Sequence, residues 1–199
     1  MNLPNKLTLS RFALTVAFLA VMFSGMPYRE TVALVFFVAA GISDFLDGQI
    51  ARRRNLITNF GILMDPLADK IMVCSAFIAF VELGWFKAWM TVIIVSRELA
   101  ITGLRLLAAS KNVVLAAERY GKHKTISQIV AVIAIFIDQI IRQNQWGSVG
   151  NAIFGWHLFG EHSWTWWVAE TFKWLSVALT FISGWVYLWK NRRLYLDDM

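Results

Sequence analysis

Apolar segments of nearly membrane-spanning length recur along this chain, and they restrict its fold more than any other feature. An α-helix needs about 20 predominantly apolar residues to cross the hydrocarbon core of a bilayer. With weakly polar flanking residues included, several of six segments reach that length: 7–23, 31–42, 71–81, 89–95, 126–141 and 174–189. Only 16% of the residues are charged, whereas a soluble domain carries about a quarter.

We therefore predict an all-α integral membrane protein, built as a bundle of six transmembrane helices. The spans are expected at roughly 5–24, 30–55, 60–83, 87–110, 123–142 and 166–190. No linker or low-complexity stretch divides the chain, so residues 1–199 are expected to form a single domain.

Lysine and arginine are distributed unevenly between the two sides that six spans would create. Fifteen of the 19 lie near the termini or the 2–3 and 4–5 junctions, and four lie on the other side: Arg29, Lys87, Arg142 and Lys173. Loops rich in these residues stay in the cytoplasm, so we predict a multi-pass protein of the cell (inner) membrane with cytoplasmic termini. Anionic lipid headgroups and phosphorylated substrates then explain the net charge of +6 without nucleic acid.

Four aspartates lie in the stretch 44–70, DFLDGQIARRRNLITNFGILMDPLADK, between two apolar segments. Helix positions i, i+3 or i+4, and i+7 share one face. Two such sets occur here: Asp44, Asp47, Gly48 and Ala51, then Gly61, Asp65, Ala68 and Asp69. The short basic segment between them predicts antiparallel neighbouring helices, with two carboxylates from each converging at the cytoplasmic end.

Four converging carboxylates repel one another unless cations intervene, and ionisable residues near hydrocarbon are functional candidates. Hard oxygen ligands suit Mg²⁺ or Mn²⁺, and we predict two such ions. Two ions can clamp both oxygens of a phosphoryl displacement. The plainer alternative pairs the aspartates with Arg52, Arg53 and Lys70 as solvated helix-end residues. A second alternative begins a helix at Asp65–Pro66, but a continuous helix over 61–72 aligns both aspartates, and we predict that.

These residues resemble a known family signature. The CDP-alcohol phosphatidyltransferases share the pattern that here reads Asp44-x2-Asp47-Gly48-x2-Ala51-Arg52-x8-Gly61-x3-Asp65-x3-Asp69. The resemblance implies six transmembrane helices, commonly a homodimer, and transfer of a phosphatidyl group from a CDP-linked lipid to an alcohol with release of CMP.

The resemblance also implies roles for individual residues. Asp44, Asp47, Asp65 and Asp69 would surround the metal ions, and Asp69 would be the general base. The CDP-diacylglycerol contacts would come from seven further positions: Asn5, Thr8, Gly48, Ala51, Arg52, Thr58 and Gly61. Metal and arginine charge suit an anionic diphosphate, and a positioned carboxylate can accept a hydroxyl proton.

Two further segments bear on the acceptor alcohol. VSRELAITGLR (95–105) and GKHKTISQ (121–128) resemble segments of the phosphatidylglycerophosphate synthases, the family members whose acceptor is glycerol 3-phosphate. Four cations in or beside these segments would bind the acceptor phosphate: Arg97, Arg105, Lys122 and Lys124. The alternative is that Arg97 pairs with Glu98 or an aspartate, and that the lysines only mark the cytoplasmic side.

Other functions remain open at this stage. A family member could use phosphatidylglycerol, serine or inositol phosphate as its acceptor. A small cation transporter could use the four aspartates as an ion site, although apart from Glu82 and Asp138 the other spans offer few polar residues for a path. His157, Glu161 and His162 could bind metal in the segment 142–167, which we expect to be external and interfacial.

Overall fold

The computed structural model describes residues 3–54, 59–111, 113, 120–159 and 162–196. For 3–8, 44–54, 59–66, 68–69, 120–122, 157–159, 193 and 196 it describes the backbone alone. The long helices are α1 (Leu3–Met22), α2 (Arg29–Arg54), α3 (Asn59–Glu82), α4 (Ala88–Ser110), α5 (Tyr120–Arg142) and α7 (Trp164–Lys190). The short elements are α6 (Gly147–Phe154), β1 (His157–Phe159), β2 (His162–Ser163) and α8 (Arg193–Leu196).

The six long helices lie where the apolar segments predicted them, within a few residues at each end. α3 runs unbroken from Asn59 to Glu82, so Pro66 lies inside the helix and the alternative of a helix start at Asp65 is wrong. A proline removes a backbone hydrogen bond, but helices packed in a membrane bundle tolerate it. The short antiparallel pair of β1 and β2 was not predicted.

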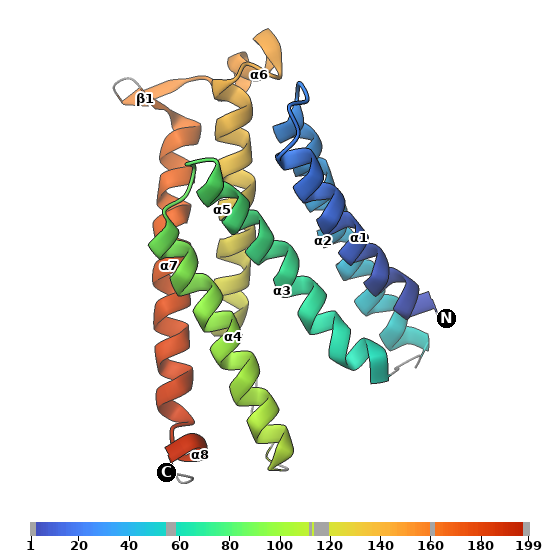
Figure 1. Ribbon diagram of the computed structural model, residues 1–199. Coiled ribbons are helices and arrows are strands. Elements are labelled where there is room, and N and C mark those ends of the chain that lie inside the picture. Colours follow the sequence, from blue (N-terminus) through green and yellow to red (C-terminus); the bar gives the residue numbers. More distant parts are fainter. Residues whose placement is uncertain (1–2, 55–58, 112, 114–119, 160–161, 197–199) are drawn as a thin grey trace.

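The helices alternate in direction, so the connections gather at two ends of the bundle (Figure 1). The start of α1, the end of α2, the start of α3, the end of α4 and the short helix α8 lie toward one end, which we call the inner end. α6 and the β1–β2 pair lie at the opposite, outer end. The described helix ends beside the termini and the two basic junctions therefore lie together, as predicted, whereas the side of the membrane that they face stays a prediction.

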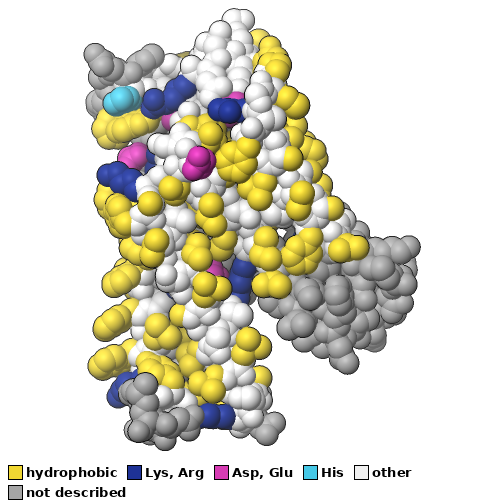
Figure 2. All heavy atoms as spheres, in the orientation of Figure 1, with side chains coloured by type: hydrophobic (Ala, Val, Ile, Leu, Met, Phe, Trp, Pro, Cys, Tyr) yellow, Lys and Arg dark blue, Asp and Glu magenta, His cyan; other side chains and the backbone are white. Residues whose placement is uncertain are grey.

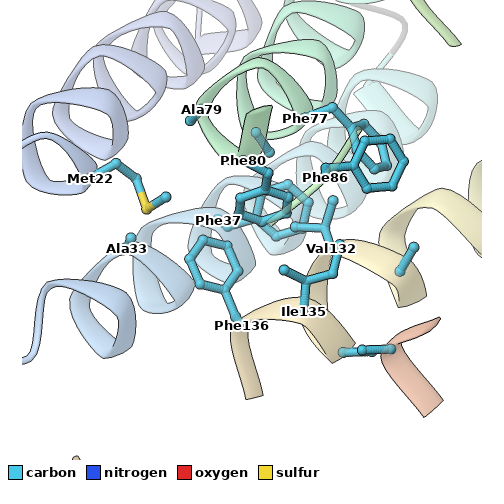
Figure 3. Packing of buried hydrophobic residues seen from close by; sticks show 14 of the residues in the cluster. Met22, Ala33, Phe37, Phe77, Ala79, Phe80, Phe86, Val132, Ile135 and Phe136 are labelled. Carbon is cyan, nitrogen blue, oxygen red and sulfur yellow. The ribbon is translucent and has the colours of Figure 1, made fainter. Parts of the chain in front are cut away.

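The hydrophobic core lies in the outer half of the bundle and is built from aromatic rings. Phe18 of α1, Phe80 of α3 and Phe136 of α5 are fully buried and meet edge to face, with ring centroids 6.1 and 5.0 Å apart around Phe136. Figure 3 shows Phe37 and Phe77 from α2 and α3 packed around the same group. This core ties α1, α2, α3 and α5 together near the outer end. A smaller hydrophobic cluster of Ile101, Leu104 and Tyr187 joins α4 to α7 nearer the inner end.

On the face of the molecule shown in Figure 2, hydrophobic side chains are exposed along much of the length of the bundle. On α7 a stripe at helical spacing is exposed, with Trp174 at 49%, Phe181 at 57% and Trp185 at 62%. Exposed apolar patches of this extent mark interaction with other proteins or with lipid. The surface therefore suits an apolar surrounding.

Among the described residues, fewer helices than the sequence predicted are by themselves long and apolar enough to span a membrane. Within the described residues one helix, 123–142, is by itself long and apolar enough to cross a bilayer, and a shorter apolar helical segment covers Leu9–Met22. The helical fold is thus confirmed, whereas the six-span arrangement stays a prediction.

Candidate active site

The acidic segment is positioned by the ends of α2 and α3. Only residues 55–58 separate the two helices, so Arg54 and Asn59 lie within about 18 Å of each other. Asp44 lies ten residues before the end of α2 and Asp69 ten residues after the start of α3, about 15 Å along each axis. Asp47 and Asp65 lie about 10 Å along theirs. The four aspartates therefore form two pairs at matching depths from the inner end.

The structure describes the backbone alone at these aspartates. The same holds for six of the seven residues expected to contact the CDP-linked lipid: Asn5, Thr8, Gly48, Ala51, Arg52 and Gly61. Thr58 lies outside the described residues. The backbone positions of the four aspartates are compatible with a set of carboxylate ligands, which Mg²⁺ and Mn²⁺ prefer. The roles of the individual residues stay predictions.

A buried carboxylate on α4 joins two of the cations predicted to bind the acceptor. Glu98 is only 7% exposed, and its Oε1 lies 3.3 Å from Nη1 of Arg97. The same oxygen accepts from Nζ of Lys124 on α5, a side chain that is 4% exposed. The structure thus brings Arg97 and Lys124 together through Glu98, so the alternative in which Arg97 pairs with Glu98 is borne out.

A second contact connects this cluster to α3. Thr102, one turn after Glu98, donates its hydroxyl to the Glu98 carbonyl oxygen at 2.7 Å. The Thr102 oxygen in turn accepts a hydrogen bond from Nζ of Lys70. Lys70 directly follows Asp69 in α3, so the polar cluster and the acidic segment share one stretch of helix.

Arg105 is not part of this cluster in the structure, and the side chain of Lys122 is not described. Arg105 is exposed, and its guanidinium faces Tyr187 on α7, with Cζ 5.8 Å from the ring centroid and Nε 3.5 Å from the hydroxyl. It lies eight residues beyond Arg97, about 12 Å farther along α4. Lys122 lies in the first turn of α5, where only the backbone is described.

Arg97 packs tightly against α7 and keeps an unused donor. A Cβ at Gly184 would lie 2.8 Å from Cγ of Arg97, so this position accommodates the arginine only as glycine. Nε of Arg97 is buried and has no hydrogen-bond partner among the described residues. Arg97 also lines a cavity of about 290 Å³ between α4 and α7, whose other walls include Ile93 and Phe181.

Another cavity lies beside the acidic segment. It has a volume of about 310 Å³, and its mainly apolar walls come from Phe37 and Gly41 of α2, Met72 of α3 and Ile133 of α5, with Arg11 of α1. Gly41 precedes Asp44 by one helical turn. An apolar space therefore adjoins the backbone that carries the first aspartate.

The outer end has a different character. Asp138 binds Arg142 at 2.8 Å and accepts from Thr165 at 3.3 Å, which ties α5 to the start of α7. His162 stacks on Trp166 with centroids 4.0 Å apart, and Glu161 lies outside the described residues. Among the side chains that the structure describes, no three His, Cys, Asp or Glu residues are grouped to hold a metal ion.

Glu98, Thr102 and Lys70 were not predicted as site residues. Glu98 was considered only as a local partner of Arg97, and Lys70 as a partner for the aspartates. A signal was present, because a carboxylate inside an apolar helix is a functional candidate. The contact with Lys124, 26 residues away on another helix, could not be inferred from spacing.

Comparison with known proteins adds to this geometry. The chain matches the CDP-alcohol phosphatidyltransferase family over residues 1–182. A relative from Bacillus subtilis (strain 168) is 37% identical, over 96% of this chain and 95% of its own. Relatives from Cereibacter sphaeroides and Rickettsia bellii are each 31% identical, over 99% and 94% of this chain and 98% and 93% of their own. All three are named CDP-diacylglycerol–glycerol-3-phosphate 3-phosphatidyltransferase.

Proposed function

The chain belongs to the CDP-alcohol phosphatidyltransferase family, and we infer that its substrates are CDP-diacylglycerol and glycerol 3-phosphate. It transfers the phosphatidyl group of the first to the second, giving phosphatidylglycerophosphate and CMP. The observation that carries this function is that three relatives, each matched over at least 93% of its length, are all named CDP-diacylglycerol–glycerol-3-phosphate 3-phosphatidyltransferase.

The donor diphosphate would lie at the acidic segment. Asp44, Asp47, Asp65 and Asp69 would hold two Mg²⁺ or Mn²⁺ ions, which when bound neutralise the diphosphate and the developing charge on departing CMP. The matching depths of the two aspartate pairs on α2 and α3 support this assignment. The nearby apolar cavity of about 310 Å³ has the character that a hydrocarbon chain of the donor requires.

The cytidine and its phosphates would be bound by residues of the family signature and the start of α1. Arg52 supplies positive charge beside the diphosphate, and Thr58 donates a hydroxyl hydrogen bond. Gly48, Ala51 and Gly61 allow the nucleotide to approach the helix backbone, because their side chains are small or absent. Asn5 and Thr8 complete the nucleotide contacts.

The reaction is a single displacement. Asp69 accepts the proton from a hydroxyl of glycerol 3-phosphate, and that oxygen forms a bond to the lipid-linked phosphorus. The bond from this phosphorus to the CMP oxygen breaks, and its electron pair leaves with CMP. Lys70 follows Asp69 and contacts Thr102, which links the proton acceptor to the polar cluster on α4.

The acceptor phosphate would be bound by Arg97 and Lys124. Their shared contact with Glu98 and the unused Nε donor of Arg97 support this position. Arg105 and Lys122 then have a secondary role, as cations nearer the inner end that attract the phosphorylated acceptor.

We propose that residues 1–199 form a single domain in the membrane. The exposed apolar stripe of α7, which suits lipid, and the membership of a family of membrane enzymes support this. In our proposal all six long helices span the bilayer, the inner end faces the cytoplasm of a bacterial cell, and two chains form a homodimer. The fifteen basic residues assigned to the inner side support the orientation.

A panel of acceptors tests the function. The purified protein in lipid vesicles would receive CDP-diacylglycerol and Mg²⁺ with glycerol 3-phosphate, serine, inositol phosphate or phosphatidylglycerol. CMP release should depend on glycerol 3-phosphate and stop when a chelator removes the metal. Release supported equally by serine or inositol phosphate would leave the family but refute the acceptor.

A further inference from the structure

Glu98 lies where a charged residue is difficult to explain by stability alone. It lies ten residues into the 23-residue helix α4 and is 7% exposed, and its partner Lys124 is 4% exposed. Replacing a buried ion pair by apolar residues of similar volume is often neutral or stabilising. A carboxylate shared between two helices at this depth therefore indicates a role beyond holding the bundle together.

The contacts around Glu98 hold two cations side by side. Arg97 on α4 and Lys124 on α5 would repel each other without an intervening negative charge, and both contact the same oxygen, Oε1. The guanidinium of Arg97 uses Nη1 for this contact, while its buried Nε is left without a hydrogen-bond partner among the described residues. One donor is therefore oriented by Glu98 and another is left for a ligand.

The charge of the cluster fits a phosphate. Its described side chains include three cations, Arg97, Lys124 and Lys70, which can supply charge-assisted hydrogen-bond donors to an anion. A phosphate monoester carries about −1.5 to −2 charge at pH 7. The cluster also contacts α3 next to Asp69, so a phosphate bound here would place the rest of a small molecule toward the acidic segment.

We propose that Glu98 is the positioning residue of the acceptor site and that it fixes Arg97 and Lys124 together for the phosphate of glycerol 3-phosphate. This inference rests on the proposed function, because it requires a phosphorylated acceptor. Glu98 itself does not contact the acceptor. It acts through the two cations, whose places in the free enzyme it maintains.

The test compares Glu98→Gln with Glu98→Asp and with a matched control, Glu170→Gln. Glu170 also pairs with a lysine, Lys173 at 3.3 Å, but in the outer half of α7. Initial rates would be measured against glycerol 3-phosphate at saturating CDP-diacylglycerol and then with the roles of the two exchanged. Inorganic phosphate would be added as a competitor for the acceptor.

Glu98→Gln keeps the shape and removes the charge, so the KM for glycerol 3-phosphate should rise about tenfold or more. The inhibition constant of inorganic phosphate should rise by a similar factor, while the KM for CDP-diacylglycerol stays within about twofold. Glu170→Gln should leave all three values unchanged. A merely structural role would instead lower the turnover or shift the constants for both substrates together, and that outcome would overturn the proposal.

Glu98→Asp decides the question if the glutamine variant does not fold. It keeps the charge but is shorter by one methylene, so it can hold one cation better than two, and the KM for glycerol 3-phosphate should rise about threefold to tenfold. An Asp variant with the wild-type KM refutes the role of Glu98. If the wild type itself shows no activity with glycerol 3-phosphate, the proposed function fails and this inference fails with it, whereas an active wild type with unaffected Glu98 variants overturns the inference alone.

Discussion

The contact between Gly184 and Arg97 allows a sharp test of where the acceptor phosphate binds. In Gly184→Ala the new Cβ would lie 2.8 Å from Cγ of Arg97. Carbon atoms in favourable contact are about 3.5–4.0 Å apart, so one of the two groups must move by about 1 Å. Cγ lies close to the α4 backbone and cannot swing away as a side-chain tip could. The arginine must therefore shift or change its rotamer.

The consequence for the site follows from the contact that Arg97 makes. Its Nη1 lies 3.3 Å from Glu98, so a further displacement of about 1 Å removes this hydrogen bond. Overpacking destabilises a protein by about 1–3 kcal/mol. Loss of one charge-assisted contact with the acceptor phosphate weakens its binding by about 1.5–3 kcal/mol, or about tenfold to a hundredfold.

The assay measures the KM for glycerol 3-phosphate, the KM for CDP-diacylglycerol and the thermal unfolding of the purified variant. Gly103→Ala is the matched control, because a Cβ at this α4 position meets nothing within 4 Å. Replacing a helical glycine by alanine without strain stabilises by about 0.4–1 kcal/mol, so the control should be at least as stable as the wild type. If Gly184→Ala has the stability and acceptor KM of the wild type, Arg97 does not hold the acceptor phosphate in the orientation seen here.

Three other experiments probe the remaining parts of the site and the orientation of the chain in the membrane. Asp69→Asn should abolish turnover while CDP-diacylglycerol still binds, measured by calorimetry, because the amide cannot accept the hydroxyl proton; near-normal turnover would exclude Asp69 as the base. Lys124→Met should raise the KM for glycerol 3-phosphate about tenfold or more, whereas Arg105→Ala, which loses a contact with Tyr187, should change it less; the reverse order would move the acceptor site to the inner end of α4. In a Cys74→Ala background, a cysteine at Arg54 should react with a membrane-impermeant label only from the cytoplasmic side and one at Ser148 only from outside; external labelling at Arg54 would reverse the orientation.

Much of the fold could be predicted because apolar segments and helical spacing are local properties. The spacing of Asp65 and Asp69 also predicted that α3 continues through Pro66, since only an unbroken helix aligns the two aspartates, and the structure confirms this. The same reasoning predicted six membrane spans, and the described residues confirm the helices but not that each of them spans a membrane. The aspartates and arginines of α2 and α3 lower the hydropathy of these helices, and among the described residues only 123–142 is apolar enough by itself.

The polar cluster shows what spacing alone could not give. The sequence predicts the same role for Arg97, Arg105 and Lys124, as cations that bind the acceptor phosphate. In the structure their partners come from different helices. Lys124 reaches Glu98 across the α4–α5 boundary, while Arg105 turns toward Tyr187 on α7. These contacts depend on how far each helix is rotated about its axis in the bundle. Gly184, which lies 87 positions after Arg97 in the sequence, packs against Arg97 and contributes to this arrangement.

The lipid product formed by the purified protein tests the proposed reaction most directly. Vesicles containing the protein, CDP-diacylglycerol and Mg²⁺ would receive either glycerol 3-phosphate or glycerol, and the lipids would be identified by mass spectrometry while CMP is quantified. We expect one molecule of phosphatidylglycerophosphate for each CMP with glycerol 3-phosphate, and no lipid product with glycerol. Phosphatidylglycerol formed from glycerol at a comparable rate, or CMP released without a new phospholipid, would contradict phosphatidyl transfer to a phosphorylated acceptor.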